Sequence, residues 1–248
     1  MSVIKKSTRN WLIFAAVLAL AVIIGYREFV SPFPVMFEAE QALAGNDDVT
    51  VIKEPYLLFE PANRRPRAGL VFYTGARVQP EAYAPIGAAL AERGYLVAIP
   101  SLPFNYAFLG VSTANDIMGE HPDVDTWVIA GHSLGGAMAA SFADRTERID
   151  GLVLLGAYPG SSLDLSNRDI EVSVVYGGND ALSTRDEVQN SVDQLPSQTE
   201  FVFLPGANHA QFGWYGLQPR DGEATISRDD QTTASVEAIV RVLADADR

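Results

Sequence analysis

Gly131-His132-Ser133-Leu134-Gly135-Gly136 contains the spacing G-x-S-x-G and lies between a predicted strand and a predicted helix. The apolar run 126–130 precedes it, and the alanine-rich stretch 137–143 follows it. Glycine on either side of the serine leaves room for a strand and a helix to approach closely around a strained turn. Such a turn lifts the hydroxyl above the carboxyl end of a sheet, at a helix N-terminus that favours developing negative charge. This context predicts a nucleophile elbow with Ser133 as the nucleophile; a glycine-rich turn with an incidental serine is the alternative.

Apolar runs and amphipathic stretches alternate along the chain on both sides of this motif. We expect strands at 56–59, 70–73, 96–99, 126–130, 152–155, 172–176 and 201–204. We expect helices at 38–44, 81–93, 115–120, 137–145, 186–195 and through 236–243. The alternation indicates an α/β fold in which a mostly parallel sheet is covered by helices on both faces.

Length and composition limit the classes of function. The chain has 248 residues and a formal net charge of −13, which fits one sizeable α/β domain. The acidic charge argues against a nucleic-acid partner, because phosphate binding needs basic patches. No cysteine is present, so disulfides and thiolate chemistry are excluded. The sequence contains no motif for a metal or a nucleotide, and we expect neither a metal nor a cofactor.

An uncharged, nearly all-apolar run extends from Trp11 to Tyr26 behind a basic flank of Lys5, Lys6 and Arg9. It is slightly shorter than the roughly 17–25 residues of a typical spanning helix, and its terminal aromatic residues suit the two membrane interfaces. The basic flank predicts a cytoplasmic N-terminus and an extracytoplasmic domain. A cleaved signal peptide is the alternative, although the small residues of a cleavage site are lacking directly after the run. We therefore expect a basic N-terminus at 1–10, a transmembrane signal anchor at 11–27, a linker at 28–50 and a catalytic domain at 51–248.

An elbow serine needs a base to take its proton, and in this kind of fold the acid and then the base follow it along the chain. His209 comes shortly after the last predicted strand, which places it at the carboxyl edge of the sheet. Asp180 follows the strand before that one through a glycine turn, and it suits the acid; an ordinary turn aspartate is the alternative. Of the other histidines, His121 lies at the opposite edge of the sheet, and the side chain of His132 is expected to point away from the Ser133 hydroxyl.

Acyl transfer also needs backbone N–H groups directed at the developing oxyanion. Leu134, directly after the nucleophile, is expected to supply the first of them. The second is expected from the loop after the strand 70–73, where position favours Ala76 and, as second choice, Arg77.

The longest predicted insertion, 211–228, follows the base and carries Phe212, Trp214 and Tyr215. We assign these three residues to substrate binding, as one wall of an open acyl pocket. A loop that packs its own aromatic side chains over the closing helix is the alternative. The interval 158–171, where a lid would enter, is too short for a helical cap. Without a lid we expect esters with short acyl groups, of roughly two to six carbons, to be the better substrates.

From about Tyr56 to Leu243 the chain resembles the alpha/beta-hydrolase superfamily, and within it the dienelactone-hydrolase-like group called alpha/beta hydrolase fold five. Besides the elbow, the resemblance rests on Phe72-Tyr73-Thr74-Gly75-Ala76-Arg77-Val78, Ile99-Pro100, Pro103-Phe104, Gly178-Asn179-Asp180 and Asn208-His209-Ala210-Gln211-Phe212-Gly213. It implies the fold, a triad of Ser133, Asp180 and His209, and hydrolysis as the reaction class. Dienelactone hydrolases proper use a cysteine nucleophile, so their substrate does not carry over.

These features together predict a membrane-anchored serine hydrolase that acts on a small-molecule carboxylic ester. Two alternatives stay open. The same triad would also serve a thioesterase or an amidase, and a hydrolase fold without turnover would be a binding module.

Overall fold

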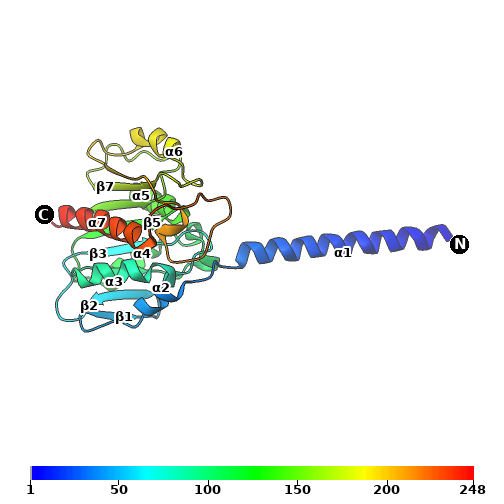
Figure 1. Cartoon of the computed structure of the whole chain (residues 1–248), viewed down its shortest axis with the longest axis horizontal. Helices are drawn as coiled ribbons and strands as arrows, with labels where there is room; N and C mark the ends of the chain where they lie inside the picture. Colours follow the sequence, from blue (N-terminus) through cyan, green and yellow to red (C-terminus); the bar gives the residue numbers. More distant parts are fainter. Residues whose placement is uncertain (1) are drawn as a thin grey trace. The chain divides into compact units, whose positions relative to one another are not determined.

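The computed structural model describes residues 2–248 of the chain, including the side chains of 10–27 and 29–248 (Figure 1). Two compact units are present, one that ends at Pro32 and one that runs Phe33–Arg248. The first unit consists of the helix α1 (Ser2–Val30). Within it, Asn10–Arg27 has 18 residues and a mean hydropathy of 1.8, and none of this stretch is buried. In the described part of the chain, α1 is the one helix long and apolar enough, by length and composition, to cross a membrane.

The second unit is built on one eight-stranded sheet with the order β1-β2-β4-β3-β5-β6-β7-β8. The pairs β1–β2 and β2–β4 are antiparallel, and every other neighbouring pair is parallel. The strands are β1 (Val49–Ile52), β2 (Leu57–Pro61), β3 (Gly69–Tyr73), β4 (Leu96–Ile99), β5 (Trp127–His132), β6 (Gly151–Leu155), β7 (Glu171–Gly177) and β8 (Glu200–Leu204).

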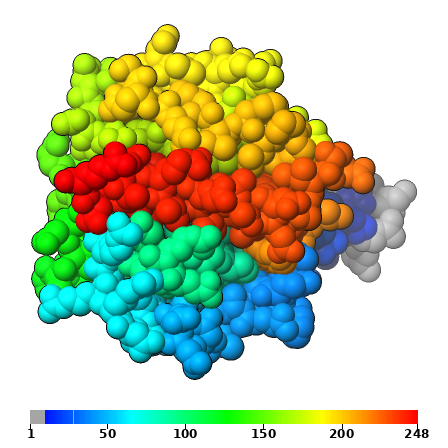
Figure 2. Space-filling model, turned by 60° about the vertical axis from the view of Figure 1, so that its left-hand side comes forward, coloured from blue at the N-terminus to red at the C-terminus, as the bar shows by residue number. Residues whose placement is uncertain are grey.

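Helices cover both faces of this sheet, and a separate apolar cluster lies under each set of helices. One face carries α3 (Ala84–Glu92) and α7 (Arg228–Ala246), which run side by side across it in Figures 1 and 2, and the short α2 (Phe37–Ala42) packs on α3. The other face carries α4 (Thr113–Glu120), α5 (Leu134–Arg145) and α6 (Arg185–Asn190).

The central strands are apolar on both faces, as expected for a parallel sheet enclosed by helices. In β3, Leu70 and Phe72 are buried in the α3–α7 cluster, whereas Val71 and Tyr73 are buried in the α4–α5 cluster. Because side chains alternate along a strand, one short apolar run contributes to both cores.

The predicted fold class is confirmed. A strand is present at each expected position, helices lie on both faces, and residues 158–171, all of which the structure describes, contain no helix. The expected helix 81–93 begins as a 3-10 turn, Pro80–Tyr83, before α3, and the expected helix 186–195 ends at Asn190 as α6.

Two features at the start of the domain differ from the sequence-based expectation. The strand β1 was not expected, and it pairs with β2 in antiparallel register. The segment 28–50 is not a linker throughout, because the compact unit begins at Phe33 rather than at residue 51. The physical reason is that α2 packs on α3 and that Ala39 within α2 is fully buried.

Candidate active site

Ser133 occupies the predicted turn between β5 and α5 and has φ 55° and ψ −125°, a strained conformation for a residue with a side chain. Its N–H donates to the Leu155 carbonyl at 3.0 Å, and its side chain is half-buried. The flanking glycines are required sterically: a Cβ on Gly131 would collide with the backbone of Gly135, and one on Gly135 would collide with the Tyr73 carbonyl. The sequence therefore folds into the tight strand–turn–helix that its glycines indicate.

Asp180 and His209 form a buried pair, with Asp180 Oδ2 2.8 Å from His209 Nδ1. The second carboxylate oxygen, Oδ1, accepts hydrogen bonds from the N–H groups of Leu182 at 2.8 Å and Ser183 at 2.7 Å. Because an ionised carboxylate can only accept hydrogen bonds, Nδ1 of His209 carries the ring proton. That leaves the lone pair on Nε2 of His209, and this atom is buried with no hydrogen-bond partner among the described residues.

The sheet register brings the acid and the histidine together. Gly177 at the end of β7 lies opposite Leu204 at the end of β8, and the Asn179 N–H donates to the Ala207 carbonyl at 2.9 Å. The two loops that carry Asp180 and His209 therefore leave the same edge of the sheet side by side.

The elbow lies against the same pair. The ring of His132, the residue before the nucleophile, is 4.6 Å from the His209 ring, centre to centre. Gly156 follows Leu155, whose carbonyl accepts the hydrogen bond from the Ser133 N–H. Gly156 lies against the acid, since a Cβ at this position would be 3.1 Å from Asp180 Oδ2. The structure thus gathers all three predicted residues at the carboxyl edge of the sheet.

The two candidates for the second oxyanion donor differ in whether their backbone N–H group is already hydrogen-bonded. The Arg77 N–H is already engaged, because it donates to the Asn105 carbonyl at 2.9 Å. The Ala76 N–H makes no hydrogen bond within the part of the chain that the structure describes, and Ala76 is partly exposed. Leu134 is the first residue of α5, where helical N–H groups lack a partner within the helix. Geometry therefore favours Ala76 and Leu134.

A contact that sequence analysis missed connects the elbow to the loop that carries Ala76. The Tyr83 hydroxyl accepts from the Gly75 N–H at 3.0 Å and lies 2.8 Å from His132 Nδ1. All three residues are buried, and burial raises the pKa of Tyr83 above its ordinary value, so the phenol keeps its proton and can donate it to His132. Burial, reinforced by the nearby His209, holds the pKa of His132 well below its ordinary value, so its ring is neutral. The His132 side chain is fully buried, and its ring packs against the rings of His209, Phe212 and Tyr215.

A second missed group, Asp221, holds the backbone of the histidine loop. Its carboxylate accepts from the N–H of His209 at 3.2 Å and from the N–H of Ala210 at 2.8 Å. The fully buried Gln231 on α7 exchanges two hydrogen bonds with the backbone of Asn208. Neither group stands in a recognisable motif, so no local signal in the sequence pointed to them.

The three aromatic residues assigned to substrate binding are buried in the fold. Phe212 and Tyr215 belong to the α3–α7 core, and the Trp214 indole N–H donates to the Thr232 hydroxyl of α7 at 3.0 Å. This burial matches the alternative expectation, a loop that packs its own aromatic side chains over the closing helix. A role of these side chains in substrate binding stays a prediction.

His121 lies away from the site, where its Nε2 is 2.8 Å from the Tyr56 hydroxyl.

Comparison with known proteins agrees with this architecture. The alpha/beta hydrolase family matches residues 69–233, more than half of the chain. A proposed dienelactone hydrolase from Klebsiella pneumoniae subsp. pneumoniae shares the fold at 15% identity and a TM-score of 0.60, over 79% of this chain and 97% of that chain. The esterase domain of a Rhodothermus marinus protein does so at 14% identity and a TM-score of 0.58, over 79% and 98%. No curated protein matches the sequence. The matched residues include the elbow and both loops of the buried pair, and the chain belongs to the alpha/beta hydrolase family.

Proposed function

We propose that the protein is a serine hydrolase that cleaves carboxylic esters through an acyl-enzyme. The observation that carries this proposal is the unpartnered Nε2 of His209, buried beside the strained elbow and oriented by Asp180 through a contact of 2.8 Å. Because Asp180 holds Nδ1 of His209 and Nε2 bonds to no described residue, Nε2 is available to accept the Ser133 proton during catalysis.

In the proposed reaction, Ser133 Oγ attacks the acyl carbonyl while His209 Nε2 takes its proton. The same proton then passes to the leaving alcohol as the ester bond breaks and the acyl-serine forms. Water, deprotonated by His209, attacks the acyl-serine, releases the carboxylic acid and restores the serine. Asp180 stays ionised and stabilises the imidazolium, and the N–H groups of Leu134 and Ala76 hold the oxyanion.

A fluorophosphonate reagent tests the proposal directly, because it labels only an activated serine. We expect the detergent-solubilised full chain to be labelled, Ser133→Ala to abolish the label, and the exposed-loop control Ser161→Ala to keep it. Labelling that persists in Ser133→Ala would show that the nucleophile is elsewhere. A wild-type chain that takes no label and hydrolyses no ester would be a binding module instead.

We further propose that α1 is an uncleaved anchor with a cytoplasmic N-terminus and the domain on the other side of the membrane. The length and hydropathy of Asn10–Arg27 support this, together with Trp11 and Tyr26 near its ends. Cleavage near Gly45 would remove α2, although Ala39 within it is fully buried in the domain. The place of α2 in the fold therefore argues against a mature form that starts there.

A further inference from the structure

The chain enters the domain at the rim of the proposed active site. The Phe33 N–H donates to the Arg77 carbonyl at 2.9 Å, and Arg77 directly follows Ala76, the proposed oxyanion donor. The Arg77 guanidinium lies 4.9 Å from the centre of the Phe33 ring. The first residue of the compact unit is thus fixed to the loop 74–77 that carries Ala76, which we call the oxyanion loop.

The residues that follow are fixed to the loop after the base. Three backbone contacts join 34–36 to 214–216: Gly216 N–H to the Pro34 carbonyl at 3.2 Å, a bridge between Val35 and Tyr215, and Met36 N–H to the Trp214 carbonyl at 3.0 Å. We call residues 33–36 the rim strand. It connects the oxyanion loop to the loop that begins at His209, so it borders the site on one side.

The rim strand is also the part of the domain that comes first after α1. Ser31 and Pro32 alone separate Val30, the last residue of α1, from Phe33. An extended chain spans roughly 3.6 Å per residue at most, so Phe33 lies within about 11 Å of the end of α1 whatever the orientation of the helix. An anchor in the membrane therefore holds the rim of the site close to the bilayer surface.

Two large apolar side chains beside the rim strand are exposed, and we call the rim strand together with these two residues the rim. Phe104 is 54% exposed and Leu217 is 88% exposed. Phe104 lies next to Asn105, whose carbonyl accepts from the Arg77 N–H at 2.9 Å, and Leu217 directly follows the paired segment 214–216. These two side chains therefore flank the place where the chain enters the domain. Exposed apolar side chains on both sides of such a point are typical of an interaction surface.

From these observations we propose that the rim docks on the bilayer that holds α1, with Phe104 and Leu217 in the interface, and that the enzyme takes esters dissolved in that bilayer. This inference rests on the proposed function and on the anchor. With a net charge of −13 the protein gains nothing overall from anionic lipids, so apolar insertion drives the docking. The expectation of short acyl substrates was based on the missing lid alone. Docking of the rim on the bilayer leads instead to the expectation of esters whose acyl chains are long enough to stay in the lipid.

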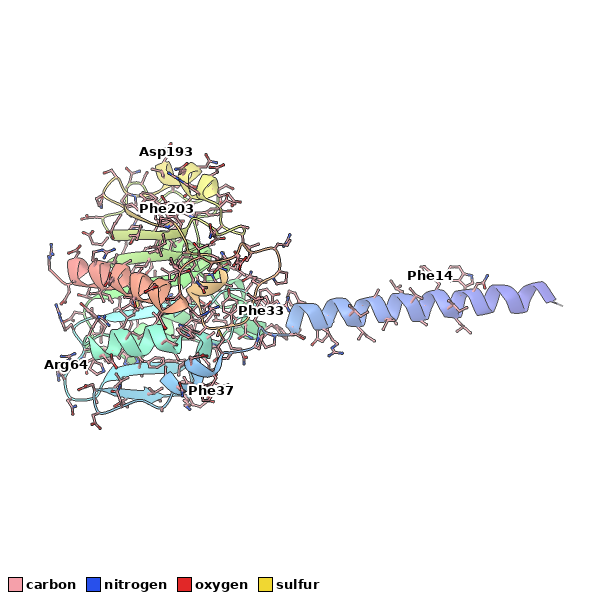
Figure 3. All side chains as sticks on the ribbon, viewed as in Figure 1. Phe14, Phe33, Phe37, Arg64, Asp193 and Phe203 are labelled. Carbon is pink, nitrogen blue, oxygen red and sulfur yellow. The ribbon has the colours of Figure 1, made fainter. Side chains whose placement is uncertain are left out.

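The lack of cysteine makes the docking measurable, because a single introduced cysteine carries the only label. Phe104→Cys, Leu217→Cys and the control Phe203→Cys are labelled with nitrobenzoxadiazole, and the full chain is reconstituted into phosphatidylcholine vesicles. Phe203 is 38% exposed on the edge strand β8 (Figure 3). We expect the labels at 104 and 217 to shift to shorter wavelength and to be quenched by nitroxide-labelled lipid, while the label at 203 stays in water. Equal quenching at all three positions, or none at any, would overturn the proposal.

A second experiment compares the rates of hydrolysis of a lipid-dissolved ester and a water-soluble ester. In the same vesicles, the double variant Phe104→Ser with Leu217→Ser should lose about tenfold of its rate on a long-chain ester dissolved in the lipid. Its rate on water-soluble p-nitrophenyl acetate should stay unchanged, and the control Phe203→Ser should change neither rate. An equal loss on both esters would overturn the docking role. If the wild type hydrolyses no ester and Ser133 takes no fluorophosphonate, the proposed function fails, whereas the fluorescence measurement still decides the docking.

Discussion

Ser133, His209 and Asp180 should contribute unequally to turnover. In the proposed mechanism the serine and the base act in the bond-making step, so Ser133→Ala and His209→Ala should each lower kcat by a factor on the order of 10⁶. The proposed role of the acid is to orient the ring and stabilise its charge, so Asp180→Asn should cost less, on the order of 10⁴. Rates on p-nitrophenyl acetate measure all three. The assignment is wrong if His121→Ala proves as damaging while His209→Ala does not.

Tyr83 holds the oxyanion loop through its hydroxyl, and the effect of removing that oxygen can be predicted. Tyr83→Phe leaves the buried Gly75 N–H without its partner at 3.0 Å, which should cost about 1–3 kcal/mol of folding free energy. The Ala76 N–H lies one residue further along the same loop, so kcat should fall about tenfold with little change in KM. A variant that loses stability but keeps the wild-type kcat would show that the contact serves folding alone.

The buried neutral ring of His132 makes stability depend on pH. Burial first, and His209 second, hold its pKa below the ordinary value of 6.5, so below that pH the unfolded chain binds a proton that the native state does not. Stability should therefore fall as the pH drops below about 6.5, on the order of 1 kcal/mol per pH unit. His132→Asn keeps an acceptor for Tyr83 but does not titrate, so its free energy of unfolding should depend less steeply on pH between 7 and 5. Parallel curves for the two proteins would contradict this.

At the scale of elements, the packing of α5 against β3 depends on the absence of a side chain at one position. Gly135→Ala would place a methyl group against the carbonyls of Tyr73 and Thr74, and this overpacking should destabilise the domain by about 1–3 kcal/mol. Gly119→Ala in α4 is the matched control, because nothing lies within 4 Å of its Cβ position. It should stabilise by about 0.4–1 kcal/mol. Urea unfolding of the full chain in detergent measures both, and similar shifts in the two variants would show that the close approach is not the cause.

The same elements show what could be predicted from sequence. Apolar runs and glycine turns are local signals, so the parallel strands, the elbow and the positions of Asp180 and His209 followed from them. β1 was missed because it is a short edge strand with alternating exposure, from buried Val49 to exposed Ile52, that becomes a strand only by pairing with β2. Tyr83 and Asp221 were missed because each binds a backbone N–H in a loop, 8 residues away for Tyr83 and 11 or 12 for Asp221, and no periodic pattern of side chains encodes such a contact.

For the whole molecule, the proposed anchor predicts one direction of the chain across the membrane. With the basic flank Lys5, Lys6 and Arg9 in the cytoplasm, protease added to intact spheroplasts should digest the domain. The membrane fraction should keep a full-length chain that starts at Met1. Protection of the domain in intact cells would reverse the orientation, and a soluble form that begins near Gly45 would instead indicate a cleaved precursor.

The short connection between α1 and the rim strand has a kinetic consequence. With Ser31 and Pro32 as the only residues between them, the proposed anchor would keep the proposed site at the surface of its own membrane. Encounter with substrate would then be a search in two dimensions, in which the relevant concentration is the mole fraction of ester among the surrounding lipids. The proposed enzyme would work in cis: it would clear esters from the membrane that holds it and leave those of a neighbouring vesicle untouched.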